Sequence, residues 1–145
     1  MKLSGILKSK GSNVISVMPG TRIRDVITLL AEKRIGAVVV CDEDHRLRGI
    51  LSERDIVRTL AAHSAATFDM AAGEIMTRGP KLATPHTTVA AAMEMMTEGR
   101  FRHLPVMEHD RLIGIVSIGD VVKARISQQE MEVDSLRAYV AGDVN

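Results

Sequence analysis

The chain contains one short segment twice, and an internal repeat constrains a fold more than any single motif does. Residues 49–55 (GILSERD) return as residues 114–120 (GIVSIGD), at an offset of 65 positions from 49 to 114. In each copy an apolar run ends in a serine, and an aspartate follows three residues later. The repeat predicts two related units, each with a strand that leads directly into a helix.

The surroundings of the two segments also repeat, with a proline turn, an apolar helix face and an apolar strand before each one. Apolar residues spaced i, i+3, i+4 and i+7 predict the helices, and short apolar runs predict the strands. In the first unit we expect an opening strand at 14–19, a helix at 23–30, a strand at 35–40 and a closing helix from Glu53. In the second unit we expect the corresponding elements at 81–85, at 89–96, at 101–106 and from Ile118.

Neither unit can bury its apolar helix face alone, so the two should pack together about a pseudo-twofold axis. The sequence therefore predicts an α/β (α+β) fold of two β-α-β-β-α repeats and a C-terminal helix. We expect Pro105 to bulge its strand or leave one side free, because proline lacks the ladder N–H. The expected segments are 1–62 for the first repeat with the N-terminal segment, 63–79 for the linker, 80–127 for the second repeat, and 128–145 for the C-terminal helix and tail.

Composition argues against several classes of function. A net charge of +1, with one tyrosine, two phenylalanines and no tryptophan, gives no basis for nucleic-acid binding. No apolar run approaches the ~20 residues of a membrane helix, and residues 1–10 lack the apolar core of a signal peptide. Cys41 is the only cysteine, so we expect a cytoplasmic protein without an internal disulfide. No residue spacing predicts a metal site or a nucleophile paired with a base.

Two units that each end in Gly-h-h-Ser-x-x-Asp, where h is apolar, resemble a pair of CBS (cystathionine β-synthase) repeats, called a Bateman module. The resemblance covers about residues 1–127, and residues 102–106 (RHLPV) strengthen it. It implies a stand-alone bacterial regulatory protein for energy or redox sensing, which binds an adenosyl ligand in a cleft between the repeats. The family's ligands are AMP, ADP, ATP, S-adenosylmethionine and NAD(H); we expect an AMP-like ligand first and NAD(H) second.

The resemblance also implies partners and site residues. The partners are a second copy, in a homodimer whose four repeats form a flat disc, and an unidentified effector protein. One carboxylate can accept both hydroxyls of a ribose diol, and a helix N-terminus or an arginine suits phosphate. The residues implied for the ribose are Asp55 and Asp120, and those implied for the phosphate are Ser52, Ser117, Arg54, Arg102 and His103, with Gly119 beside Asp120. Gly36 and Ala37 are the small counterparts of Arg102 and His103 in the first repeat. Ile15 and Lys81 are implied to contact the adenine, with Ile35 and Phe101 as apolar neighbours.

Three other interpretations stay open at this point. A Ser-x-x-Asp sequence at a helix start is also a capping arrangement, in which the hydroxyl and the carboxylate bond backbone N–H groups. Arg102 and His103 are also compatible with a solvated pair at a strand start, and Arg54 with a solvated first-turn residue. The alternatives to a sensor are a structural dimerisation module with empty clefts and a small enzyme.

Overall fold

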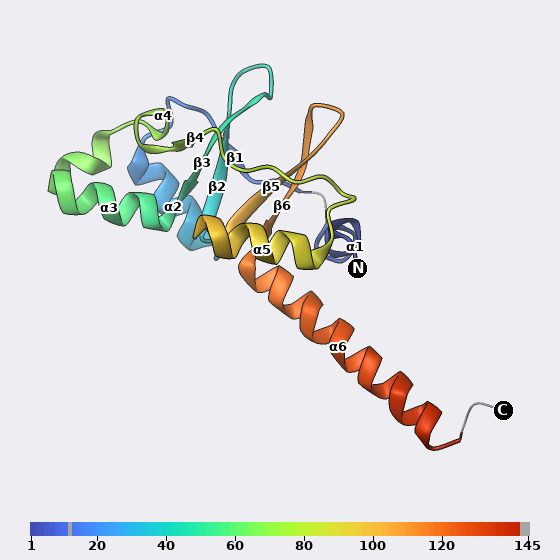
Figure 1. The fold of residues 1–145 in the computed structure, drawn as a ribbon. Helices are drawn as coiled ribbons and strands as arrows, with labels where there is room; N and C mark the ends of the chain where they lie inside the picture. Colours follow the sequence, from blue (N-terminus) through green and yellow to red (C-terminus); the bar gives the residue numbers. More distant parts are fainter. Residues whose placement is uncertain (12, 143–145) are drawn as a thin grey trace.

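The computed structural model describes residues 1–11 and 13–142, and the two predicted units appear in it as two sets of elements (Figure 1). The first set comprises β1 (Ser16–Val17), α2 (Ile23–Lys33), β2 (Ala37–Cys41), β3 (Leu47–Ser52) and α3 (Glu53–His63). The second comprises α5 (Val89–Gly99), β5 (His103–Glu108), β6 (Arg111–Ser117) and α6 (Ile118–Val140). The other elements are α1 (Leu3–Lys10), the 3-10 helix η1 (Ser64–Asp69), α4 (Ala72–Ile75) and β4 (Thr77–Arg78).

The sheets confirm the predicted α/β class and the repeated topology. The first repeat has a sheet in the order β1-β2-β3-β4, in which β1 and β2 are parallel and the other pairs are antiparallel. The second repeat has the antiparallel pair β5-β6. Its predicted opening strand is reduced to a single parallel bridge between Ala83 and Val106, which two backbone hydrogen bonds of 2.8 and 3.0 Å hold in place.

The predicted strands at 35–40 and 101–106 begin two residues later than expected, at Ala37 and His103. The helices before them end at Arg34 and Arg100, whose φ angles of 54° and 55° lie in the left-handed region. This conformation turns the chain out of the helix, and two further residues bring it to the sheet. The pairs 35–36 and 101–102 therefore lie in the connections that approach the opposite repeat.

A bulge does occur beside Pro105, but proline is not its cause. The register of β5 and β6 shifts between Val106 and Met107. The register of β2 and β3 shifts at the corresponding place, between Val40 and Cys41, where the chain has no proline. The bulge is thus a property of the repeat, and Pro105 fits it because only its carbonyl is used, as acceptor for the N–H of Ala83.

Each repeat has its own hydrophobic core, and each core is completed by a segment from outside the repeat. The first contains Ala72 of α4, and the second contains Leu3 and Ile6 of α1. The N–H of Leu3 bonds the carbonyl of Thr87 at 2.9 Å, which fixes α1 to the second repeat. The predicted N-terminal segment therefore packs on the second repeat, although it precedes the first in sequence; the four predicted segment boundaries stay predictions.

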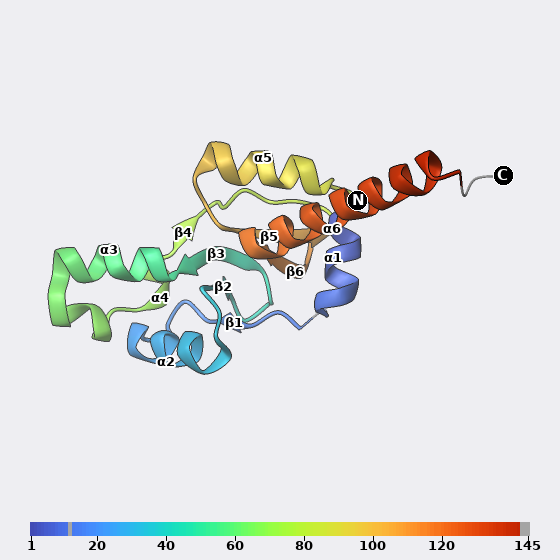
Figure 2. The same ribbon diagram turned by 90° about the horizontal axis from the view of Figure 1, so that it is seen from below.

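The closing helix of the second repeat and the predicted C-terminal helix are one continuous helix. α6 runs for 23 residues from Ile118 to Val140. No glycine or proline occurs between Gly119 and Gly142, so nothing in the sequence ends the helix near residue 127. In Figures 1 and 2 the last part of α6 extends away from the rest of the molecule.

The first glycines of the two repeated segments provide a test of this packing. A Cβ at Gly49 would lie 2.6 Å from the carbonyl oxygen of Thr77 in β4, whereas a Cβ at Gly114 would meet the terminal Cδ2 of Leu7 at 2.5 Å. A backbone atom cannot yield as a flexible side-chain end can, so Gly49→Ala should lower the free energy of unfolding by about 1–3 kcal/mol. Gly114→Ala should cost less in urea denaturation; an equal or larger loss for Gly114→Ala would contradict this account.

Candidate functional site

A cavity of about 340 Å³ lies between the two repeats, where the start of α3 faces the chain at 79–81 and the turn after α5. This volume lies within the range of small-molecule pockets. Predicted residues from both repeats line it, namely Ser52, Arg54, Asp55, Lys81, Phe101, Arg102 and His103. The first repeat thus supplies its serine and aspartate, and the second supplies a basic and apolar wall.

The remaining predicted residues do not line this cavity. Ile15 and Ile35 are partly buried against the first core, and Ala37 is buried in β2. Ser117, Gly119 and Asp120 lie at the start of α6. Contact of these residues and of Gly36 with a ligand stays a prediction.

The start of α3 combines a helix cap with a carboxylate directed at the cavity. The N–H of Asp55 donates to Ser52 Oγ at 3.3 Å, and the N–H of Ser52 donates to Asp55 Oδ2 at 2.9 Å. This is a complete capping box, so the capping interpretation is confirmed. The other carboxylate oxygen, Oδ1, accepts only a long 3.4 Å bond from Thr77 Oγ1. Capping therefore leaves one oxygen of Asp55 for a hydroxyl donor.

Positive charge surrounds this carboxylate. The cations that line the cavity are Arg54, Arg58, Lys81, Arg100 and Arg102, against the carboxylates of Glu53 and Asp55. Arg54 Nη1 donates to the carbonyl of Arg100 at 3.1 Å, so this guanidinium reaches from the first repeat to the second. An excess of cations in a concave surface attracts anions, and the partial positive charge at the start of the α3 dipole acts in the same direction.

His103 lies at the boundary between the repeats, and Gly36 makes room for it. A Cβ at Gly36 would lie 3.3 Å from His103 Nε2 and 3.2 Å from Glu53 Oε1. The small residue predicted at this position therefore accommodates two side chains of the cavity. Burial lowers the pKa of His103 below its ordinary value, and the positive charges of Lys10 and Arg102 lower it further against the opposing effect of Glu53 and Asp120. The imidazole is consequently neutral at pH 7.

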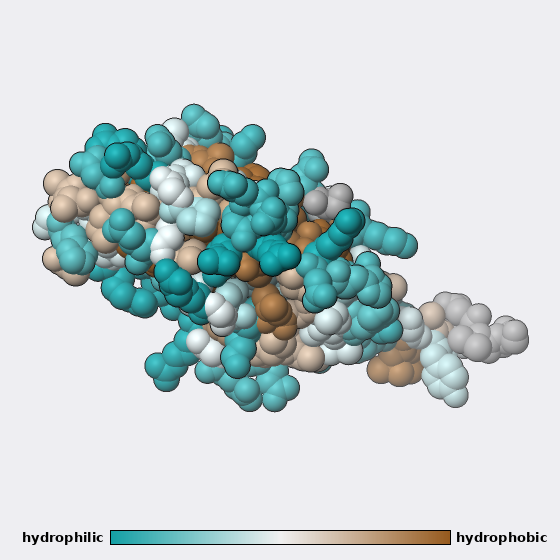
Figure 3. Space-filling model, turned by 90° about the horizontal axis from the view of Figure 1, so that it is seen from above, coloured by the Kyte–Doolittle hydropathy of each residue, from teal (hydrophilic) through white to brown (hydrophobic). Residues whose placement is uncertain are grey.

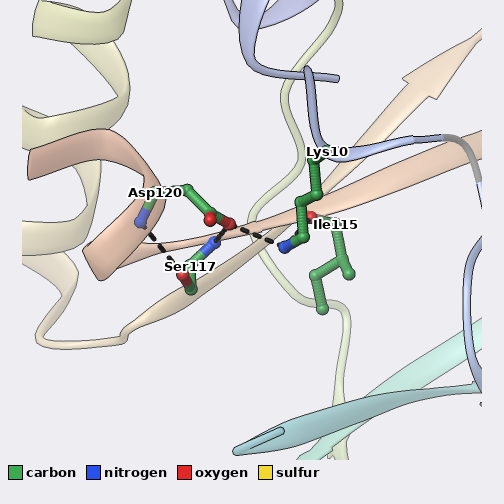
Figure 4. Close-up of polar contacts among 4 residues, drawn as sticks. All are labelled: Lys10, Ile115, Ser117 and Asp120. Carbon is green, nitrogen blue, oxygen red and sulfur yellow. Dashed lines mark hydrogen bonds and ion pairs between the residues drawn. The ribbon is translucent and has the colours of Figure 1, made fainter. Parts of the chain in front are cut away.

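The second copy of the motif has a different partner. Ser117 and Asp120 form a capping box like that of Ser52 and Asp55. Lys10 of α1 also donates to Asp120 Oδ2 at 2.6 Å and to the carbonyl of Ile115 at 3.0 Å (Figure 4). Burial raises the pKa of Asp120, but the hydrogen bonds from Lys10 and Ser117 outweigh it and leave this pKa below its usual value. The carboxylate of Asp120 is therefore already paired with an ammonium group of the chain itself.

Sequence reasoning missed four polar residues of these two places. Arg58 stands one helical turn after Arg54, so helical spacing could have identified it. Arg100 ends α5 in the left-handed conformation, which no residue pattern announces. Thr77 comes from the linker and reaches Asp55 because β4 joins the first sheet. Lys10 is far from Asp120 in sequence, and only the packing of α1 brings them together.

Comparisons with known proteins agree with this architecture. The CBS domain family model matches residues 9–62 and 72–127, so the chain belongs to the CBS domain family and carries two copies. The chain is 35% identical over 148 residues to "CBS domain-containing protein CBSX3, mitochondrial" of Arabidopsis thaliana, covering 97% of this chain and 72% of that protein. The chain also matches two longer CBS proteins of A. thaliana, but it spans only 23% and 24% of their length.

Solved structures extend the comparison. A CBS-domain containing protein from Agrobacterium tumefaciens matches with a TM-score of 0.84 and 42% identity, over 86% of this chain and 99% of that one. A CBS domain protein from Pyrobaculum aerophilum, complexed with AMP, matches with a TM-score of 0.73 and 29% identity, over 83% and 89% of the two chains. Both confirm the tandem fold of this chain.

Two kinds of feature are absent from the described residues, 1–11 and 13–142. Among them no helix has the length and apolar character needed to cross a membrane. The same residues contain no group of three or more His, Cys, Asp or Glu side chains placed to hold a metal ion. Cys41 is buried, and its burial raises the pKa of the thiol.

The lowered pKa of His103 predicts a pH dependence of stability. The unfolded chain binds the proton more readily than the folded one, so the free energy of unfolding should fall as the pH drops from about 7.5 to about 5.5. His103→Gln should reduce this fall in urea denaturation at the two pH values. His86→Gln is the matched control, because His86 is exposed. Equal pH dependence in wild type and His103→Gln would refute the role of His103 in the pH dependence of stability.

Proposed function

We propose that this chain is a regulatory module that binds an adenine nucleotide in the cavity between its repeats. One observation carries the proposal: a single concave surface combines a carboxylate with a free oxygen, a helix N-terminus and an excess of cations. A nucleotide has the complementary groups, namely a ribose diol that donates and a phosphate that accepts. The AMP complex of the P. aerophilum relative supports the choice of ligand.

In the proposed complex, each part of the nucleotide contacts cavity residues of complementary chemistry. The ribose hydroxyls would donate to Asp55, and the phosphate would accept from the start of α3 and from Arg102. Phe101 offers an apolar surface to the adenine ring. The Ser52 hydroxyl caps α3 and needs no proton transfer in this role, so we assign no catalytic residue.

AMP is the first candidate ligand and NAD(H) the second. A single phosphate is satisfied by one guanidinium together with the helix N-terminus. A pyrophosphate would also engage Arg54, whose bond to the carbonyl of Arg100 would have to break. AMP therefore requires less rearrangement. The signal would pass in trans to an effector protein, and a cytoplasmic setting suits such a sensor.

The proposal predicts different effects for the two aspartates of the repeat. AMP at about 100-fold its dissociation constant should stabilise the protein by about 2.7 kcal/mol. Asp55→Asn should weaken AMP binding roughly 10- to 100-fold, since a hydrogen bond to a charged group contributes about 1.5–3 kcal/mol. Asp120→Asn is the matched control and should bind AMP like the wild type. Titration calorimetry and thermal shift measure both quantities.

Three outcomes would contradict this proposal, and each supports a different alternative. Absence of any thermal shift with AMP, ATP or NADH would favour a structural module with empty clefts. Consumption of the nucleotide, detected by chromatography after incubation, would favour an enzyme. Loss of AMP binding in Asp120→Asn with retention in Asp55→Asn would move the site to the second copy of the motif.

A further inference from the structure

The last part of α6 has no packing partner within the described chain. Val121 and Ala124, in the first turns of the helix, are buried against the second repeat. Every residue from 129 to 137 is exposed, and this part projects beyond the body (Figures 1 and 2). An isolated helix of this length is only marginally stable in water, and most helices depend on tertiary packing. The projecting part therefore requires a partner surface.

Most of the large apolar residues exposed on α6 form a heptad stripe, whereas Met131 and Tyr139 lie outside the stripe. Its members are Val122, Ile126, Val133, Leu136 and Val140, which are 39%, 50%, 47%, 63% and 78% exposed. Together with Gln129 they alternate in steps of four and three residues, which is the spacing of the two core positions of a coiled coil. The space-filling view shows hydrophobic residues on the projecting end of the helix among hydrophilic ones (Figure 3).

The order of residue types within the stripe favours a coiled coil of two parallel helices. In heptad notation the a positions are Ile126, Val133 and Val140, all β-branched, and the d positions are Val122, Gln129 and Leu136. Parallel dimers favour β-branched residues at a, as at all three a positions here, and leucine at d, as at Leu136. The body packs on Val121 and Ala124, at heptad positions c and f. These positions lie outside the a/d seam, so the seam is free to meet another helix.

We propose that α6 pairs with α6 of a second copy of this chain as a parallel, in-register, two-stranded coiled coil. The charged residues beside the seam indicate that the partner helix is a second copy of α6. In this arrangement each g residue faces the e residue five positions later on the other helix. Arg125 then faces Glu130 of the second copy, and Glu132 faces Arg137 of the second copy. Both pairs attract, so the helix is complementary to itself in the parallel orientation.

The antiparallel orientation has the opposite charge pattern. There the e residues face e residues and the g residues face g residues across the seam. With a residues packed against d residues, Glu130 would face Glu130 and Glu132 would face Glu132 of the second copy. Lys123 would face Arg137. All three pairs repel, so the same residues that favour the parallel dimer disfavour the antiparallel one.

Disulfide trapping of the full chain tests the orientation directly. Gln129→Cys, made with Cys41→Ala, places one thiol in the seam, and mild oxidation should give a covalent dimer in high yield. In the antiparallel dimer residue 129 faces residue 133, so the two thiols would not meet. Met131→Cys is the matched control, because position f points away from the seam and should give little covalent dimer. Equal trapping at both positions, or none at 129, would overturn the proposal.

Sedimentation of the full chain tests the energetics. The wild type should be a dimer, and Leu136→Glu should weaken it at least 10-fold. Met131→Glu, at a similarly exposed f position, should leave it unchanged; the two residues are 63% and 71% exposed, so neither substitution disturbs a core. Glu132→Arg should weaken the dimer, and Glu132→Arg with Arg137→Glu should restore it. A monomeric wild type, or a dimer insensitive to Leu136→Glu, would overturn the proposal, whether or not AMP binds.

Discussion

The turn from strand to helix, closed by a serine and an aspartate, determines most of what is distinctive in this fold. In each repeat the hydroxyl and the carboxylate bond the free backbone N–H groups that a helix start would otherwise leave unpaired. A third N–H, of Glu53 or Ile118, donates to the carbonyl of residue 36 or 102 at 2.9 or 2.7 Å. These bonds fix each helix start to the connection that precedes β2 or β5, so the serine and the aspartate hold the same place in both repeats.

The two equal turns have different surroundings because the segments that complete the two cores differ. The linker supplies β4 to the first sheet, and Thr77 then lies beside Asp55 without covering it. The N-terminal helix completes the second core, and its last residue, Lys10, bonds Asp120. One carboxylate remains open to a cavity and the other is neutralised by the chain. The asymmetry is thus a consequence of where two short helices pack, outside the repeated sequence.

The sequence repeat predicted the fold well because apolar spacing and the capping motif are local signals. It placed the starts of α3 and α6 at the observed residues and anticipated a cleft between the repeats, where the structure has a cavity. It could not predict the bond between Lys10 and Asp120, because that depends on the packing of α1 across the molecule. It also separated α6 into two elements, since the residues after 126 are mostly polar, although the helix has no breaker there.

The length of α6 has a mechanical consequence. Its first turn contains Asp120, and its 23 residues form a rod about 35 Å long at a rise of 1.5 Å per residue. In a rod of this length a small rotation gives a large displacement. A tilt of about 5° at the start of α6 moves its C-terminal end by about 3 Å. If a change in the bond between Lys10 and Asp120 tilted the start of α6, the displacement would be greatest at Val140, at the far end of the helix.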